Sequence, residues 1–199
     1  FMEAHQRGLP CPPASNIAAF VRYARDLVQL ARVDAVLITC STMNRAYGQV
    51  EAALAPMGVP VVQIDRPMME EAVRRGGKVL VVATHGPTIE STQALLREAA
   101  AEMGRQISFS GALVEEAWEC LARGDVAAHN EALANAIRAA LRQDPDLGCI
   151  VLAQLSMAVF LLSYPQPEDA FGLPVLTSAV IWFWLYMALH WLRRRFDVY

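Results

Sequence analysis

Continuous hydrophobic runs alternate along this chain with segments in which hydrophobic residues recur every three or four positions. Short continuous runs are typical of strands buried on both faces, and the longer period indicates amphipathic helices. Strands are predicted at 33–39, 59–64, 78–83, 106–113, 149–154 and 174–178. Helices are predicted at 16–31, 43–55, 68–75, from about 88 to 103, at 114–122, 125–142 and in a short segment ending at 163.

This order of elements predicts an α/β fold. Hydrophobic strands that are separated by single helices form parallel sheets, and right-handed connections place helices on both faces of the sheet. No linker divides the interior of the chain. We therefore expect one α/β domain at 16–178, preceded by an irregular segment at 1–15 and followed by a hydrophobic, aromatic-rich helix at 179–199.

Composition narrows the class of protein further. The 199 residues are 55% hydrophobic, enough for one buried core. The net charge is −3 and there is no basic stripe, so nucleic acid is not an expected partner. The four cysteines lack Cys-x-x-Cys spacing and a neighbouring histidine cluster, which argues against a metal site or a disulfide framework. No signal peptide precedes the domain, and the expected location is the cytoplasm.

Polar residues follow three of the predicted strands at their carboxyl ends. The three clusters are Thr39-Cys40-Ser41-Thr42-Met43-Asn44, Thr84-His85-Gly86-Pro87-Thr88 and Gln154-Leu155-Ser156. The carboxyl ends of parallel strands share one edge, where ligands of open α/β sheets bind. Hydroxyls and free N–H groups at helix starts suit a carboxylate there. Each hydroxyl could instead cap a helix, Cys40 could be a small core residue, and His85 a surface residue. Repetition at three strand ends favours a ligand site.

Several short motifs in this order resemble the aspartate/glutamate/hydantoin racemase superfamily. They are Val-Leu-Ile-Thr-Cys-Ser-Thr at 36–42, Val-Pro-Val-Val-Gln-Ile-Asp at 59–65, Glu-Ala-Val-Arg-Arg-Gly-Gly at 71–77, Val-Val-Ala-Thr at 81–84, Ile-Val-Leu-Ala-Gln at 150–154 and Leu-Pro-Val-Leu-Thr-Ser at 173–178. The resemblance spans about 17–178. It implies a three-layer, parallel-sheet fold of two similar halves, a homodimer, and a reaction on a small carboxylate without cofactor or metal.

The resemblance also implies a mechanism in which two thiols face opposite sides of a carbon next to a carboxylate. Carried over to this chain, Cys40 is the first acid/base thiol, and a helix N-terminus stabilises a thiolate. The residues that would hold the substrate are Ser41, Thr42, Asn44, Thr84 and Thr88. His85 is a candidate catalytic partner, and Gln154 occupies the position of the second cysteine, with Ser156 two residues further on.

Gln154 is a departure from the family pattern, because glutamine cannot act as a general base. A racemase or isomerase that uses Cys40 as its acid/base thiol is the first interpretation. A single-cysteine cis–trans isomerase or decarboxylase of the same fold is the second. A non-catalytic or degenerate carboxylate-binding protein is the third.

Both ends also depart from the family pattern. The sequence predicts no counterpart of the family's first strand, since the proline-rich run at 8–13 is not expected to form a strand. The segment 179–192 is hydrophobic on all sides, where an amphipathic helix is expected. An altered reading frame or a fragmentary gene would explain both ends and is preferred over a dimer interface or a membrane-surface anchor through 179–195. As a helix, the 14 residues at 179–192 would span ~21 Å, which is less than the ~30 Å hydrocarbon core of a bilayer. A helix that crosses a membrane is therefore not the preferred interpretation of this segment.

Overall fold

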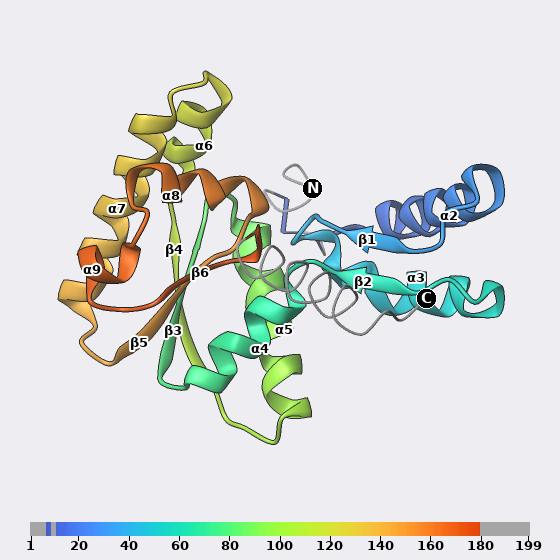
Figure 1. Ribbon diagram of the computed structural model, residues 1–199, viewed down its shortest axis with the longest axis horizontal. Coiled ribbons are helices and arrows are strands. Elements are labelled where there is room, and N and C mark those ends of the chain that lie inside the picture. Colours follow the sequence, from blue (N-terminus) through green and yellow to red (C-terminus); the bar gives the residue numbers. More distant parts are fainter. Residues whose placement is uncertain (1–6, 9–10, 180–199) are drawn as a thin grey trace, which may run out of the picture.

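The strands of this protein form two separate parallel sheets (Figure 1) in the computed structural model, which describes residues 7–8 and 11–179. The larger sheet has the order β4–β3–β5–β6, and the smaller sheet pairs β1 with β2. The strands are β1 (Val36–Ile38), β2 (Val61–Gln63), β3 (Lys78–Ala83), β4 (Ser108–Leu113), β5 (Leu147–Leu152) and β6 (Val175–Thr177). The helical segments are α2 (Ala14–Ala31), η1 (Met43–Ala46), α3 (Tyr47–Leu54), η2 (Ala55–Met57), α4 (Arg66–Arg75), α5 (Gly86–Glu102), α6 (Glu115–Ala122), α7 (Val126–Gln143), η3 (Leu155–Val159), α8 (Phe160–Ser163) and α9 (Pro167–Phe171).

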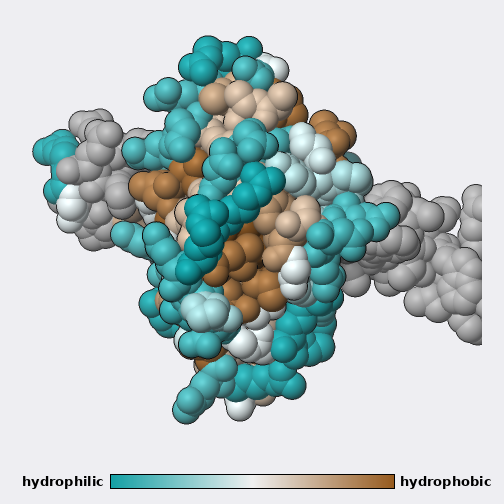
Figure 2. All heavy atoms as spheres, turned by 90° about the vertical axis from the view of Figure 1, so that its left-hand side faces the viewer, coloured by the Kyte–Doolittle hydropathy of each residue, from teal (hydrophilic) through white to brown (hydrophobic). Residues whose placement is uncertain are grey.

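The larger sheet is the centre of a three-layer sandwich. Successive residues of β3 are buried on opposite faces: Val79 and Val81 pack under α4 and α5, and Leu80 and Val82 pack under the layer formed by α6 to α9. Both faces of the strand are therefore buried, which explains its continuous hydrophobic sequence. Figure 2 views the protein from the side of the α6–α9 layer, where hydrophilic side chains surround exposed hydrophobic ones.

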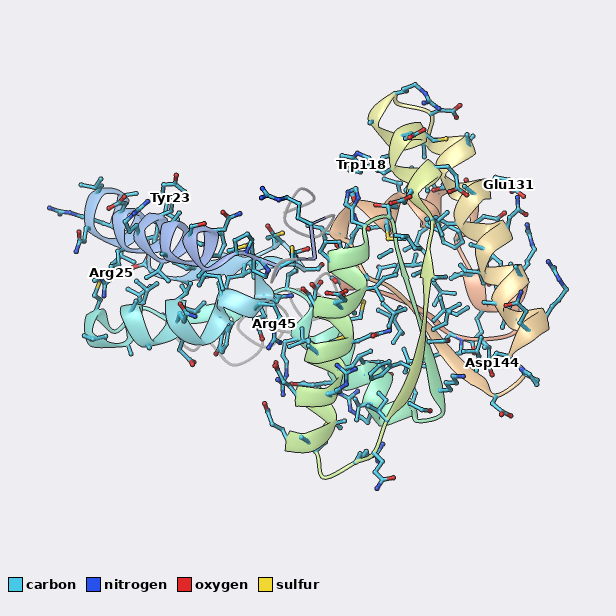
Figure 3. All side chains as sticks on the ribbon, turned by 180° about the vertical axis from the view of Figure 1, so that it is seen from behind. Tyr23, Arg25, Arg45, Trp118, Glu131 and Asp144 are labelled. Atoms are coloured by element: carbon cyan, nitrogen blue, oxygen red, sulfur yellow. The ribbon has the colours of Figure 1, made fainter. Side chains whose placement is uncertain are left out.

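Among the described residues, helices cover only one of the two faces of the smaller sheet. Helices α2 and α3 pack against the face that carries Val36 and Ile38. Leu37 points to the opposite face and is 48% exposed. In Figure 1 this sheet, with α2 and α3, extends to the right of the larger sheet, and Tyr23 on α2 points away from the body of the protein (Figure 3).

The two sheets contain strand pairs with the same register, which confirms the prediction of two similar halves. Val36 of β1 pairs with Val61 of β2, and Ile150 of β5 pairs with Val175 of β6. Each residue of the second pair lies 114 positions after its counterpart in the first pair. β1 and β5 therefore occupy equivalent places. In the larger sheet β3 pairs with β5 on the side away from β6. No strand of the described residues occupies the corresponding place beside β1.

The order and type of the predicted elements are confirmed, with two differences. The predicted strands are found, but β5 begins and ends two residues earlier than expected. Between the helical segment predicted to end at 163 and the strand predicted from 174, where no element was predicted, the structure has a short helix, α9. Pro167 at its first position is compatible with a helix start, and Gly172, with φ 71°, ends it in the left-handed conformation.

The predictions for the two ends fall mostly outside the described residues. Residues 7–8 and 11–13 contain turns and bends and no strand. The predicted C-terminal helix lies outside the described residues from position 180 onward, as do most residues of the membrane-anchor alternative. None of the helices in the described part of the chain has the length and hydrophobicity needed to cross a bilayer.

Candidate active site

The carboxyl ends of β1, β3 and β5 surround a cavity of about 240 Å³. Its lining residues are Thr39, Cys40, Ser41, Thr42, His85, Thr88, Gln154, Leu155 and Ser156. Most of the residues predicted from the sequence therefore lie together, although they come from three strand ends in two different sheets. The predicted residues Thr84 and Asn44 are not among those that line this cavity.

Three helical segments begin at this cavity. Segment η1 follows the turn after β1, α5 begins directly after His85, and η3 begins at Leu155. The start of a helix carries backbone N–H groups without intrahelical partners and a partial positive charge. The cavity is therefore suited to a small anion on electrostatic grounds.

Two threonines connect the two halves at the cavity wall. The hydroxyl oxygens of Thr42 and Thr88 lie 3.2 Å apart, and both residues are buried. One of these hydroxyls donates to the other, so that one of the two hydroxyl hydrogens is left to donate elsewhere. Since Thr42 follows β1 and Thr88 lies in the first turn of α5, this hydrogen bond also fixes the two polar clusters relative to each other.

Gln154 is held by Thr84. Its side-chain oxygen Oε1 accepts hydrogen bonds from the backbone N–H of Thr84 at 2.7 Å and from the Thr84 hydroxyl at 2.9 Å. Both donors of Thr84 are engaged in this contact, so Thr84 contributes to the cavity through Gln154 rather than directly. The role of Thr84 in substrate binding stays a prediction.

Cys40 and Cys149 have opposite environments. Cys40 is exposed and lines the cavity, at the position equivalent to Gln154 in the other half. Cys149 is fully buried in the sheet, and burial raises the pKa of its thiol to about 11. Of these two thiols, only Cys40 is placed to react with a ligand.

This contrast predicts the order of thiol alkylation. With iodoacetamide at neutral pH, Cys40 should be modified before Cys149, because the thiolate is the reactive form and Cys149 is both buried and protonated. Peptide mass spectrometry over a time course measures the order. In denaturant the difference should disappear, and equal rates in the folded protein would contradict the buried position of Cys149.

A buried carboxylate supports the turn that carries Cys40. Asp65, two residues after the end of β2, accepts a hydrogen bond from the Asn44 amide at 2.8 Å and another from the Ser178 hydroxyl. The backbone oxygen of Asn44 accepts from the Gln63 amide at 3.2 Å. Asn44 thus fixes the end of the turn. Sequence reasoning missed Asp65 and Ser178 as site residues, although Asp65 follows the strand predicted at 59–64 and Ser178 is the last residue of the strand predicted at 174–178.

Asp65 should make the free energy of unfolding depend on pH. Burial raises the pKa of its carboxyl group, and the hydrogen bonds from Ser178 and Asn44 oppose this rise only in part. A raised pKa means that the folded state binds the proton more tightly, so this contribution to stability is lost as pH rises from ~3.9 through the folded-state value. Asp65→Asn should therefore reduce stability most at acid pH and less near neutrality. Urea unfolding of both proteins across this range tests it, and a constant difference would contradict it.

Trp118 is a third residue near the site that the sequence did not indicate. Its ring lies 5.1 Å from that of His85 in an edge-to-face arrangement, and 43% of the residue is exposed. Figure 3 shows Trp118 on α6, near the start of α5. No motif surrounds this residue in the sequence, and only the fold brings α6 next to the end of β3. Among the described residues, no three His, Cys, Asp or Glu side chains are grouped so as to hold a metal ion.

Comparison with known proteins places this fold and cavity in a family. The model of the Asp/Glu/Hydantoin racemase family matches residues 11–186. The chain belongs to this family. No curated protein sequence matches the chain.

Solved structures of several enzymes share the fold. Glutamate racemase from Francisella tularensis in complex with D-glutamate is 16% identical, with a TM-score of 0.61 over 90% of this chain and 65% of that one. A variant of arylmalonate decarboxylase is 21% identical, with a TM-score of 0.54 over 88% of this chain and 75% of that one. A variant of maleate isomerase from Pseudomonas putida S16, with maleate, is 20% identical, with a TM-score of 0.51 over 87% and 70%. The chain thus spans slightly less than two thirds of the length of the glutamate racemase.

Proposed function

We propose that this protein moves a proton at the carbon next to a carboxylate of a small amino or dicarboxylic acid, without a cofactor, as a racemase or isomerase. Cys40 is the acid/base thiol in this proposal. The observation that carries it is the exposed Cys40 thiol in a cavity that helix starts and threonine hydroxyls also line. The family of the chain, whose solved relatives include racemases and an isomerase, supports the same class of reaction.

The chemistry requires the donors that surround the cavity. A C–H bond next to a carboxylate is a very weak acid, so the negative charge that develops on the carboxylate oxygens must be stabilised by prearranged donors. The spare hydroxyl hydrogen of the Thr42–Thr88 pair and the start of α5 are suited to this role. The cavity of about 240 Å³ is smaller than the ~300–1,000 Å³ of typical drug-sized sites, which favours a small substrate.

A single-cysteine isomerase or decarboxylase is the second candidate. Gln154 favours it, because the position equivalent to Cys40 in the other half carries no acid or base. A one-thiol reaction could still protonate a carbanion formed by another route, such as loss of carbon dioxide from a malonate-like acid. A homodimer, which the family resemblance implies, is a further proposal that light scattering of the purified protein would test.

Isotope exchange tests the proposed function directly. The purified protein is incubated in deuterium oxide with D- or L-glutamate, D- or L-aspartate, maleate or phenylmalonate, and the products are followed by proton NMR and chiral chromatography. Deuterium at the carbon next to a carboxylate, with inversion, would support a racemase. Conversion of maleate or loss of carbon dioxide would support the second candidate. Binding of these acids without any exchange or conversion would favour the non-catalytic interpretation.

A further inference from the structure

Gln154 has an amide with one polar atom fixed and the other left for a ligand. Its oxygen accepts from the Thr84 backbone N–H and from the Thr84 hydroxyl. A backbone N–H can only donate, so the atom facing Thr84 has to be the amide oxygen and the two ends of the amide cannot be exchanged. The nitrogen Nε2 is therefore turned away from Thr84.

The Nε2 group finds no acceptor among the described residues. Gln154 lines the cavity and is partly accessible there, at the place equivalent to Cys40. An amide donor fixed by two hydrogen bonds loses little conformational freedom when it binds a ligand, which favours binding. An amide is also neither acid nor base at neutral pH, so it can stabilise charge without taking or giving a proton.

We propose that Gln154 is the carboxylate-binding donor of this cavity, and that Thr84 acts as a positioning residue which fixes the Gln154 amide. In this arrangement Nε2–H binds an oxygen of the substrate carboxylate and holds its charge while Cys40 acts on the adjacent carbon. The inference rests on the proposed carboxylate site. In two-thiol members of the family, the position of Gln154 carries the second thiol. In this chain, the same position would bind the substrate instead.

The side-chain amide itself provides the first test. In the ¹⁵N-labelled native protein, the Gln154 amide resonances are identified by their absence from the spectrum of Gln154→Glu. Titration with malonate should shift them progressively to saturation, and acetate should do so more weakly. This readout does not depend on turnover: shifts without isotope exchange would support the amide donor and contradict the proposed reaction. Unchanged Gln154 resonances at saturating malonate would overturn the inference.

Substitution provides the second test. Gln154→Glu keeps an acceptor for Thr84 but replaces the donor with a negative charge, and Gln154→Met removes both functions at similar length. At neutral pH both should bind malonate about tenfold or more weakly, because a hydrogen bond to a charged group is lost. Below pH ~4.3 the Gln154→Glu side chain is protonated and can donate again, so its affinity relative to the native protein should recover.

A matched control separates this effect from a general change of charge. Gln106 is exposed and precedes β4 at the opposite edge of the sheet, so Gln106→Glu makes the same chemical change far from the cavity. Its affinity for malonate should equal that of the native protein. Circular dichroism checks that each variant is folded. Native affinity in folded Gln154→Met would overturn the proposal, as would equal losses in Gln154→Glu and Gln106→Glu.

Discussion

Replacing Cys40 with alanine should lower the rate of isotope exchange by about 10²–10⁴-fold, the contribution that a positioned acid or base typically makes. Cys40 is the exposed thiol of the cavity, on the turn that also carries Thr42 and that Asp65 holds through Asn44. Alanine removes the sulfur and leaves the backbone of the turn unchanged. The loss should therefore fall on turnover, with malonate affinity changed by less than about threefold. Exchange rates by NMR and affinities by titration measure the two quantities separately.

The control for this prediction is a cysteine away from the cavity. Cys120 on α6 is partly exposed, and its sulfur contacts Arg123 instead of cavity residues. Cys120→Ala should exchange deuterium at the native rate. Native exchange in Cys40→Ala would reject the catalytic role of this thiol, and a loss in both variants would point to a structural effect. Retained binding with lost exchange is the result that an acid/base role requires.

The buried strands of the larger sheet could be predicted closely from the sequence. In β3 every residue from Val79 to Ala83 is buried, and the predicted and observed ranges of this strand agree. Here the local hydrophobic pattern and the tertiary environment point to the same structure. The clusters after β3 and β5 could also be grouped correctly, because parallel strands of one sheet bring their carboxyl ends to a common edge. The cluster after β1 reaches the same cavity from the smaller sheet, through the packing of the two halves. The rule about strand ends places residues near one another but does not determine which atoms meet.

The contacts within the site could not be predicted, because they depend on how the two halves pack. The hydrogen bond between Thr84 and Gln154 joins residues 70 positions apart, and that between Asp65 and Ser178 joins residues 113 positions apart. A local sequence pattern cannot predict contacts between residues that are this far apart in the sequence. The division into two sheets is likewise a property of strand pairing: hydrophobicity predicts that β2 and β3 are strands but not that they belong to different sheets.

Phe160→Ala should have the largest effect on stability among these changes, lowering the free energy of unfolding by about 3–5 kcal/mol. Phe160 is fully buried, and its ring stacks on Tyr164 at 4.7 Å and on Phe171 at 5.8 Å between ring centroids. Alanine would remove these contacts and leave a cavity that the surrounding helices can fill only in part. The ring also anchors the segment that follows Gln154, so the substitution should weaken malonate binding as well. Urea unfolding and malonate titration measure both effects.

Leu162 in the same short helix is the matched control. It is 76% exposed, so Leu162→Ala removes a hydrophobic side chain of similar size without opening the core, and it should change stability by less than about 0.5 kcal/mol. A similar loss of stability in both variants would mean that α8 as a whole is only marginally stable and that the ring of Phe160 does not anchor it. A large loss of stability together with weaker malonate binding, in Phe160→Ala alone, would show that the Phe160 ring holds the segment after Gln154 in place. In that case the binding role of Gln154 depends on a core residue six positions further along the chain.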